Sequence, residues 1–213
     1  MTLLPGSGSR DDPAVSRGTR VFFALGPDPD ALPGLLERQR DLLLLCRGRR
    51  IRTVRPENLH VTLAFLGDRT DEEIAGLITA ARNIALPQAP IRARTGDVLA
   101  LPHLERPRVV ALELLSDGTI EHLAVQVAER TEAIGNRERR PFLAHLTLVR
   151  MNGGQLRPGA VEPMLVPLTT FALLASLTEP SGVRYEPLWS AELCAGDPVR
   201  AGISSLPTRS RTS

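Results

Sequence analysis

Lysine is absent from the 213 residues, so all 26 basic side chains are arginine. A compositional bias of the source genome is the simplest explanation. Arginine nevertheless offers forked donors that suit phosphate, so these side chains would favour an anionic partner wherever a cleft gathers them. The net charge of only +2 does not by itself indicate such a partner.

Long hydrophobic runs and cysteines are also scarce. No stretch approaches the roughly 18 uninterrupted apolar residues that span a bilayer, and the opening residues lack the charged and apolar regions of a secretory signal. Cys46 and Cys194 are the only cysteines, and neither has a second Cys or a His at metal-ligand spacing. These absences predict a cytoplasmic protein with reduced, structural cysteines and no bound metal or other cofactor.

Aromatic residues make up only 3% of the chain. They show none of the interleaving with basic residues that is typical of domains that stack RNA bases. Phe22, Phe65, Phe142, Tyr185 and Trp189 are therefore predicted to belong to the hydrophobic core.

Both ends of the chain are rich in Gly, Ser, Pro and charged residues. This composition predicts disordered tails over residues 1–18 and 197–213. The remaining residues, 19–196, match the size of one domain, since domains usually contain about 100–200 residues. We expect a single compact unit that is a monomer.

Hydrophobic periodicity between the tails predicts strands and helices. Apolar runs rich in β-branched and aromatic residues predict strands over 19–26, 51–54, 59–67, 91–101, 106–115, 143–150, 169–177 and 183–194. Apolar residues at helical spacing predict helices over 28–48, 71–82 and 117–135, the second opened by a capping box of Thr70 and Glu73. Because several adjacent strands are joined by hairpin-length links, the pattern favours an α+β fold of two related lobes over a doubly wound sheet.

One short motif occurs twice, in NLHVTLAFLG at residues 58–67 and in FLAHLTLVRM at residues 142–151. Each copy contains a His, an apolar residue, a Thr and a Leu in that order. On a strand, residues two apart point to the same face, so His60 projects with Thr62 and His145 projects with Thr147. The apolar residues between them, and Phe65 after them, are predicted to point into the core. If the two strands face one another across a cleft, it holds two imidazoles and two hydroxyls.

This set of groups suits acid-base chemistry at phosphorus. A phosphodiester needs a base for the attacking water and an acid for the departing oxygen, and two imidazoles with ordinary pKa values of about 6.5 can divide these roles near neutral pH. The threonine hydroxyls can donate to the non-bridging oxygens. Two other interpretations are a pair of structural histidines and a two-histidine metal site, but Glu57, the nearest third ligand, should point away from His60.

The sequence resembles the 2H phosphoesterase superfamily, specifically the bacterial and archaeal RNA 2',3'-cyclic phosphodiesterases once called 2'-5' RNA ligases. The resemblance is carried over residues 19–194 by RVFFAL (20–25), VRPENLHVTLAFLGD (54–68), RPRVVALEL (106–114) and RPFLAHLTLVR (140–150). It implies a bilobal α+β fold of mostly antiparallel sheet, with both motifs lining a central cleft. It also implies metal-independent opening of a terminal 2',3'-cyclic phosphate of RNA to a 2'-phosphate.

The resemblance also implies roles for individual residues. His60 matches the proton donor to the leaving 3'-oxygen, His145 matches the base that activates water, and Thr62 and Thr147 match the phosphate ligands. Arg150 matches a basic residue that follows the second motif and is a candidate phosphate ligand. Strict alternation points Arg150 away from His145, so its place at the site requires a twist, a bulge or the end of the strand.

Three other functions stay open at this point. The same site run in reverse would be a 2'-5' RNA ligase, and a small cyclic nucleotide could replace RNA as the substrate. A non-catalytic RNA-binding module would keep the cleft, although such a module has no need of two histidines.

Overall fold

The computed structural model describes residues 18–48, 50–134, 141–180 and 182–193. Apart from Gly18, the predicted tails lie outside these residues, as do Cys194 and Gly135. The strands are β1 (Thr19–Pro27), β2 (Cys46–Arg47), β3 (Ile51–Thr53), β4 (Val61–Arg69), β5 (Ile91–Leu101), β6 (Val109–Leu115), β7 (His145–Met151), β8 (Gln155–Leu156), β9 (Leu165–Glu179) and β10 (Gly182–Glu192). The helices are α1 (Leu32–Leu45), α2 (Asp71–Arg82) and α3 (Thr119–Thr131), with short 3₁₀ turns η1 (Pro29–Ala31), η2 (Pro56–Asn58) and η3 (Glu132–Ile134).

Eight strands form one antiparallel sheet in the order β1-β4-β7-β6-β5-β9-β10, with β3 added beside β7. Because β9 pairs with β1 as well as with β5 and β10, the sheet closes into a ring. One half contains β1, β4, β9 and β10, and the other contains β3, β5, β6 and β7. The predicted α+β class with mostly antiparallel strands is confirmed.

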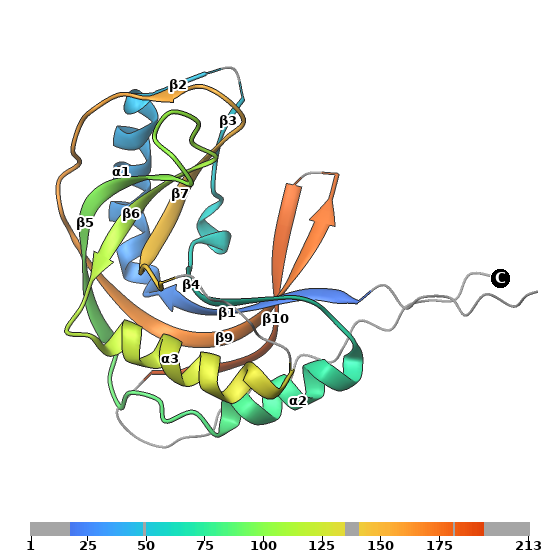
Figure 1. The fold of residues 1–213 in the computed structure, drawn as a ribbon. Helices are drawn as coiled ribbons and strands as arrows, with labels where there is room; N and C mark the ends of the chain where they lie inside the picture. The colour runs from blue at the N-terminus through green and yellow to red at the C-terminus, as the bar shows by residue number, and fades with distance from the viewer. Residues whose placement is uncertain (1–17, 49, 135–140, 181, 194–213) are drawn as a thin grey trace, which may run out of the picture.

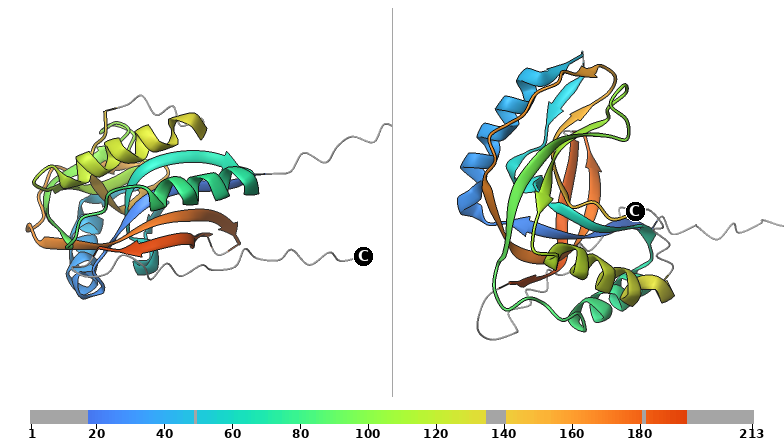
Figure 2. Two further views of the ribbon diagram at one scale, coloured as in Figure 1. Left: turned by 90° about the horizontal axis from the view of Figure 1, so that it is seen from below. Right: turned by 60° about the vertical axis from the view of Figure 1, so that its left-hand side comes forward.

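The helices cover the outer faces of these two halves (Figures 1 and 2). Helices α2 and α3 lie side by side along one half, and α1 lies along the other, near β7. Their buried faces carry the apolar residues predicted from the spacing, including Leu35, Ile74, Leu77, Leu123 and Val127. The helices therefore fill the core behind the sheet.

Local chemistry explains where the helices begin and end. The predicted capping box at α2 is present: the Thr70 hydroxyl accepts from the Glu73 backbone N–H (3.2 Å) and the Glu73 carboxylate accepts from the Thr70 N–H (2.8 Å). Helix α1 ends at Leu45, three residues before the predicted end at Gly48, because Cys46 and Arg47 pair with β8. Among the described residues, no helix is both long and apolar enough to cross a membrane.

Candidate active site

The two motifs meet where the halves of the sheet join. Strand β4 pairs with β7 through Val61 and Leu146, the buried residues at the centre of each motif. In an antiparallel pair, the residues on either side of such a position lie next to one another and point to the opposite face. The two motif histidines and two motif threonines, all half-buried, are therefore gathered on one face of the sheet.

A β-bulge brings Arg150 to this same face. Val110 of β6 pairs with Val149, but the next residue, Ala111, pairs with Thr147, so Leu148 is an extra residue on β7. The extra residue reverses the alternation, which makes Leu148 and Val149 both buried and turns Arg150 to the side of Thr147. The bulge that Arg150 needs in order to lie on the same face as His145 is therefore present.

Gln39 on α1 stabilises the bulge. The carbonyl of Leu148 accepts from the Val54 backbone N–H (2.9 Å) and from the Gln39 amide (2.9 Å), which also donates to the Val54 carbonyl (2.8 Å). Gln39 is itself buried. A buried amide with both N–H groups satisfied fixes the backbone geometry that directs Arg150, and periodicity gave no indication of this role.

The first motif contains the same irregularity. Strand β4 shifts its pairing with β1 so that Leu63 is an extra residue, and Leu63 and Ala64 are both buried. Phe65 consequently points away from the core and is 62% exposed, which shows that its predicted core position was wrong. Phe65 and Arg150 thus hold corresponding positions, each three residues after a motif threonine.

Both imidazoles are oriented in the same way. His60 Nδ1 lies 2.7 Å from the carbonyl oxygen of Asn58, and His145 Nδ1 lies 2.8 Å from that of Leu143. Since a carbonyl only accepts, each Nδ1 carries the proton and donates it. In the neutral ring Nε2 then carries no proton and can only accept, and that of His60 accepts from the Thr62 hydroxyl at 3.1 Å.

His60 is packed between aromatic rings. Its ring centroid lies 5.0 Å from that of Phe22 and 5.0 Å from that of Tyr185, and these two rings lie edge to face at 4.9 Å. Tyr185 also accepts a long hydrogen bond of 3.5 Å from Arg150. The prediction that Tyr185 is only a core residue missed this placement, because β10 reaches the motif only in the folded chain.

These surroundings lower the pKa of His60 to about 4. Burial is the main cause, and the positive charges of Arg150 and of a protonated His145 add to it, against the opposing hydrogen bond to Asn58. His60 is therefore neutral in the free protein at neutral pH. It can serve as an acid only if an anionic ligand first raises its pKa.

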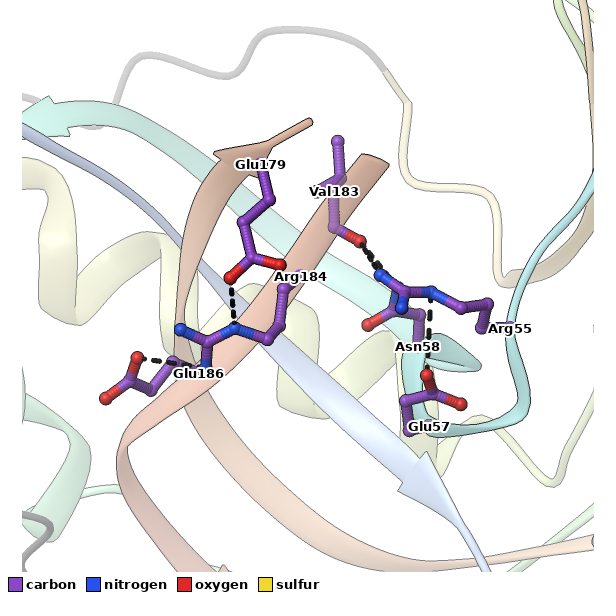
Figure 3. Close-up of polar contacts among 7 residues, drawn as sticks. All are labelled: Arg55, Glu57, Asn58, Glu179, Val183, Arg184 and Glu186. Atoms are coloured by element: carbon purple, nitrogen blue, oxygen red, sulfur yellow. Dashed lines mark hydrogen bonds and ion pairs between the residues drawn. The ribbon is translucent and has the colours of Figure 1, made fainter. Parts of the chain in front are cut away.

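The β9–β10 hairpin supports the chain segment that precedes His60 (Figure 3). The carbonyl of Val183 accepts from the Arg55 guanidinium (3.1 Å) and from the Asn58 amide (2.9 Å). On the same hairpin, Arg184 bridges two glutamates, with contacts of 2.7 Å to Glu179 and 3.2 Å to Glu186. The residue whose carbonyl orients His60 is thus itself held by β10.

The alternative of a metal site gains no support from Glu57, which forms an ion pair with Arg55 at 3.5 Å. Within residues 18–48, 50–134, 141–180 and 182–193, no three His, Cys, Asp or Glu side chains lie close enough to share a metal ion.

The low pKa of His60 predicts how stability depends on pH. Between pH 6.5 and 4 the unfolded chain binds a proton that folded His60 does not, so the free energy of unfolding falls as the pH falls. From pH 7.5 to pH 5 the native protein should lose about 2 kcal/mol more stability than His60→Gln. Urea denaturation of both proteins at the two pH values measures this, and parallel pH dependences would contradict it.

Comparisons with known proteins agree with this geometry. The family described as "LigT like Phosphoesterase" matches residues 25–111. An RNA 2',3'-cyclic phosphodiesterase of Thermus thermophilus is 30% identical over 176 residues, which is 78% of this chain and 86% of the relative. One from Archaeoglobus fulgidus is 34% identical over 101 residues, which is 47% of this chain and 56% of that relative.

Solved structures share the fold. The crystal structure of E. coli LigT complexed with 3'-AMP has a TM-score of 0.68 and 26% identity, covering 83% of this chain and 98% of its own. That of TT0787 from Thermus thermophilus has a TM-score of 0.67 and 28% identity, covering 84% and 99%. The shared fold, together with the paired motifs, defines a phosphoesterase. The chain belongs to the LigT-like phosphoesterase family.

Proposed function

We propose that this protein is a metal-independent RNA 2',3'-cyclic phosphodiesterase that forms a 2'-phosphate end. The observation that carries the proposal is the gathering of His60, Thr62, His145 and Thr147 on one face, on either side of the Val61–Leu146 pair. The relatives from Thermus and Archaeoglobus are named RNA 2',3'-cyclic phosphodiesterases, which supports the choice of substrate. The cytoplasmic location and the monomeric state stay predictions.

In the proposed reaction His145 takes a proton from water as the water oxygen bonds to phosphorus. The bond from phosphorus to the 3'-oxygen breaks, and His60 gives that oxygen a proton, leaving a 3'-hydroxyl and a 2'-phosphate. Thr62, Thr147 and Arg150 donate to the non-bridging oxygens, where negative charge grows.

The low pKa of His60 fits an acid that is charged only when substrate is bound. The cyclic phosphate carries a negative charge, which raises the pKa of a neighbouring imidazole and favours uptake of a proton. Its Nε2, which carries no proton in the neutral ring, is the atom that takes up this proton and later releases it. His60 is therefore protonated, and able to act as an acid, when the anionic substrate is bound.

The proposal is tested with the full chain, EDTA and a short RNA ending in a 2',3'-cyclic phosphate. We expect turnover to a 2'-phosphate, identified by ³¹P NMR. A 3'-phosphate product would reverse the assignment of the leaving oxygen, and an unchanged but tightly bound RNA would indicate a binding module instead.

Two further assays distinguish the proposed function from a 2'-5' RNA ligase and from a phosphodiesterase for small cyclic nucleotides. An RNA with a 5'-hydroxyl should give little 2'-5' joined product, because water at high concentration competes for the cyclic phosphate. A small cyclic nucleotide used at much higher kcat/KM than the RNA would move the function to that substrate.

A further inference from the structure

A cluster of arginines that is separate from the two motifs lies beyond the end of β7. A cavity of about 720 Å³ is lined by Arg47, Arg106 and Arg108, and by the glycines at 48, 153 and 154. Among the described residues that line it, Glu105 is the one acidic side chain. The cavity lies where β2 and β8 approach the loop between β5 and β6, at one end of the molecule (Figure 1).

The wall formed by β2 and β8 depends on glycine. A side chain at Gly154 would collide with the Arg47 carbonyl oxygen, and the Gly154 φ of +120° disfavours any other residue. A Cβ at Gly48 would lie 2.8 Å from the Gly153 carbonyl oxygen. The backbone at Gly48 therefore packs directly against the backbone at Gly153 and Gly154. This close packing keeps the wall of the cavity next to Arg47.

Arg52 connects this cavity with the active site. It pairs directly with Arg150 across β3 and β7, so the two exposed guanidinium side chains share a face. Like charges in this position repel one another unless an anion lies between them. Within the part of the chain that the structure describes, Arg47, Arg52, Arg106 and Arg108 take part in no ion pair.

The spacing suits a polymer. From Thr147 to Met151, where β7 ends, the strand rises roughly 13 Å at about 3.3 Å per residue, and the next residue, Asn152, lines the cavity. A phosphate in the cavity is thus well separated from one at the two histidines. Forked arginine donors suit phosphate oxygens, and two phosphates of one strand that are separated by more than one nucleotide can occupy both places.

We propose that this arginine cavity, together with Arg52, binds a backbone phosphate of an oligonucleotide whose cyclic end lies at His60 and His145. The inference deepens the proposed function and rests on it. It makes the substrate an RNA chain rather than a mononucleotide, because only a chain reaches the second phosphate.

The test compares a nucleoside 2',3'-cyclic phosphate with a short oligonucleotide ending in the same nucleotide. For R106Q/R108Q we expect KM for the oligonucleotide to rise at least about tenfold, with kcat for it and kcat/KM for the mononucleotide unchanged. The slope of log(kcat/KM) against log[salt] should become shallower by about 0.7 for each phosphate that the substituted side chains no longer neutralise. The charge-matched control R40Q/R130Q, on the outer helices, should behave as the native protein.

Equal losses on the two substrates, or no loss on either, would overturn the proposal, as would an equal loss in the control. R47Q/R52Q provides an independent pair if R106Q/R108Q does not fold. Fluorescence anisotropy with a 3'-phosphorylated oligonucleotide tests the cavity without turnover. If the native protein hydrolyses neither substrate, the proposed function fails, and this binding measurement still decides whether the cavity holds RNA.

Discussion

Replacement of His145 by alanine should lower kcat on a 2',3'-cyclic phosphate about 10²–10⁴-fold, the usual contribution of a general acid or base. Its imidazole is held by the Leu143 carbonyl on the same face as Thr147, so its removal deletes a proton acceptor without disturbing the core. Affinity for the substrate should change little, since the phosphate ligands stay in place. Single-turnover kinetics and equilibrium binding measure the two effects separately.

His60→Ala should show a loss of similar size. If the two imidazoles act as one unit, the double variant should be little slower than either single variant, because effects within a catalytic unit do not add. His122 is an exposed histidine on α3, so His122→Gln is the matched control and should keep native activity. A His145→Ala protein that retained native kcat would contradict the assignment of both histidines.

Replacement of Arg150 by glutamine should reduce kcat about 10²–10³-fold, as expected when one donor to a charged transition state is lost. The same change should raise the pKa of His60 above its value of about 4, because the charge of Arg150 is one of the causes that lower it. The C–H resonance of the imidazole, followed by NMR from pH 3 to pH 8, reports that pKa directly.

Arg150→Lys is the informative partner variant. It keeps the charge and should leave the pKa of His60 close to native, but it loses the forked donors and should recover only part of the activity. A normal rate in Arg150→Gln, with an unchanged His60 pKa, would show that the guanidinium does not reach the site in solution.

The two strand motifs, the three helices and their buried faces could be predicted because they depend on local patterns. The alternation of His and Thr with apolar residues predicts strands with one polar face, and the Thr70–Glu73 pair predicts the start of α2. The resemblance added the roles of the four motif residues, which stay proposals until they are measured.

The wrong prediction for Phe65 and the missed roles of Gln39 and Tyr185 all come from structure that local sequence patterns do not encode. A bulge is not encoded by alternation, so alternation predicts a buried Phe65, whereas the extra residue Leu63 turns Phe65 to the exposed face. Contacts across long sequence separations are equally hidden. Gln39 lies 109 positions from the carbonyl that it holds, and Tyr185 comes from a strand that reaches His60 only after folding.

The sequence alone thus determined the class of fold, the polar residues available for chemistry and the strands that carry them, because period and residue type are local properties. Only the tertiary structure decided which groups share one face, the direction of Arg150 and the pKa of His60. These depend on strand register, on bulges and on desolvation by distant rings, and each is set by residues that the chain brings together from far apart.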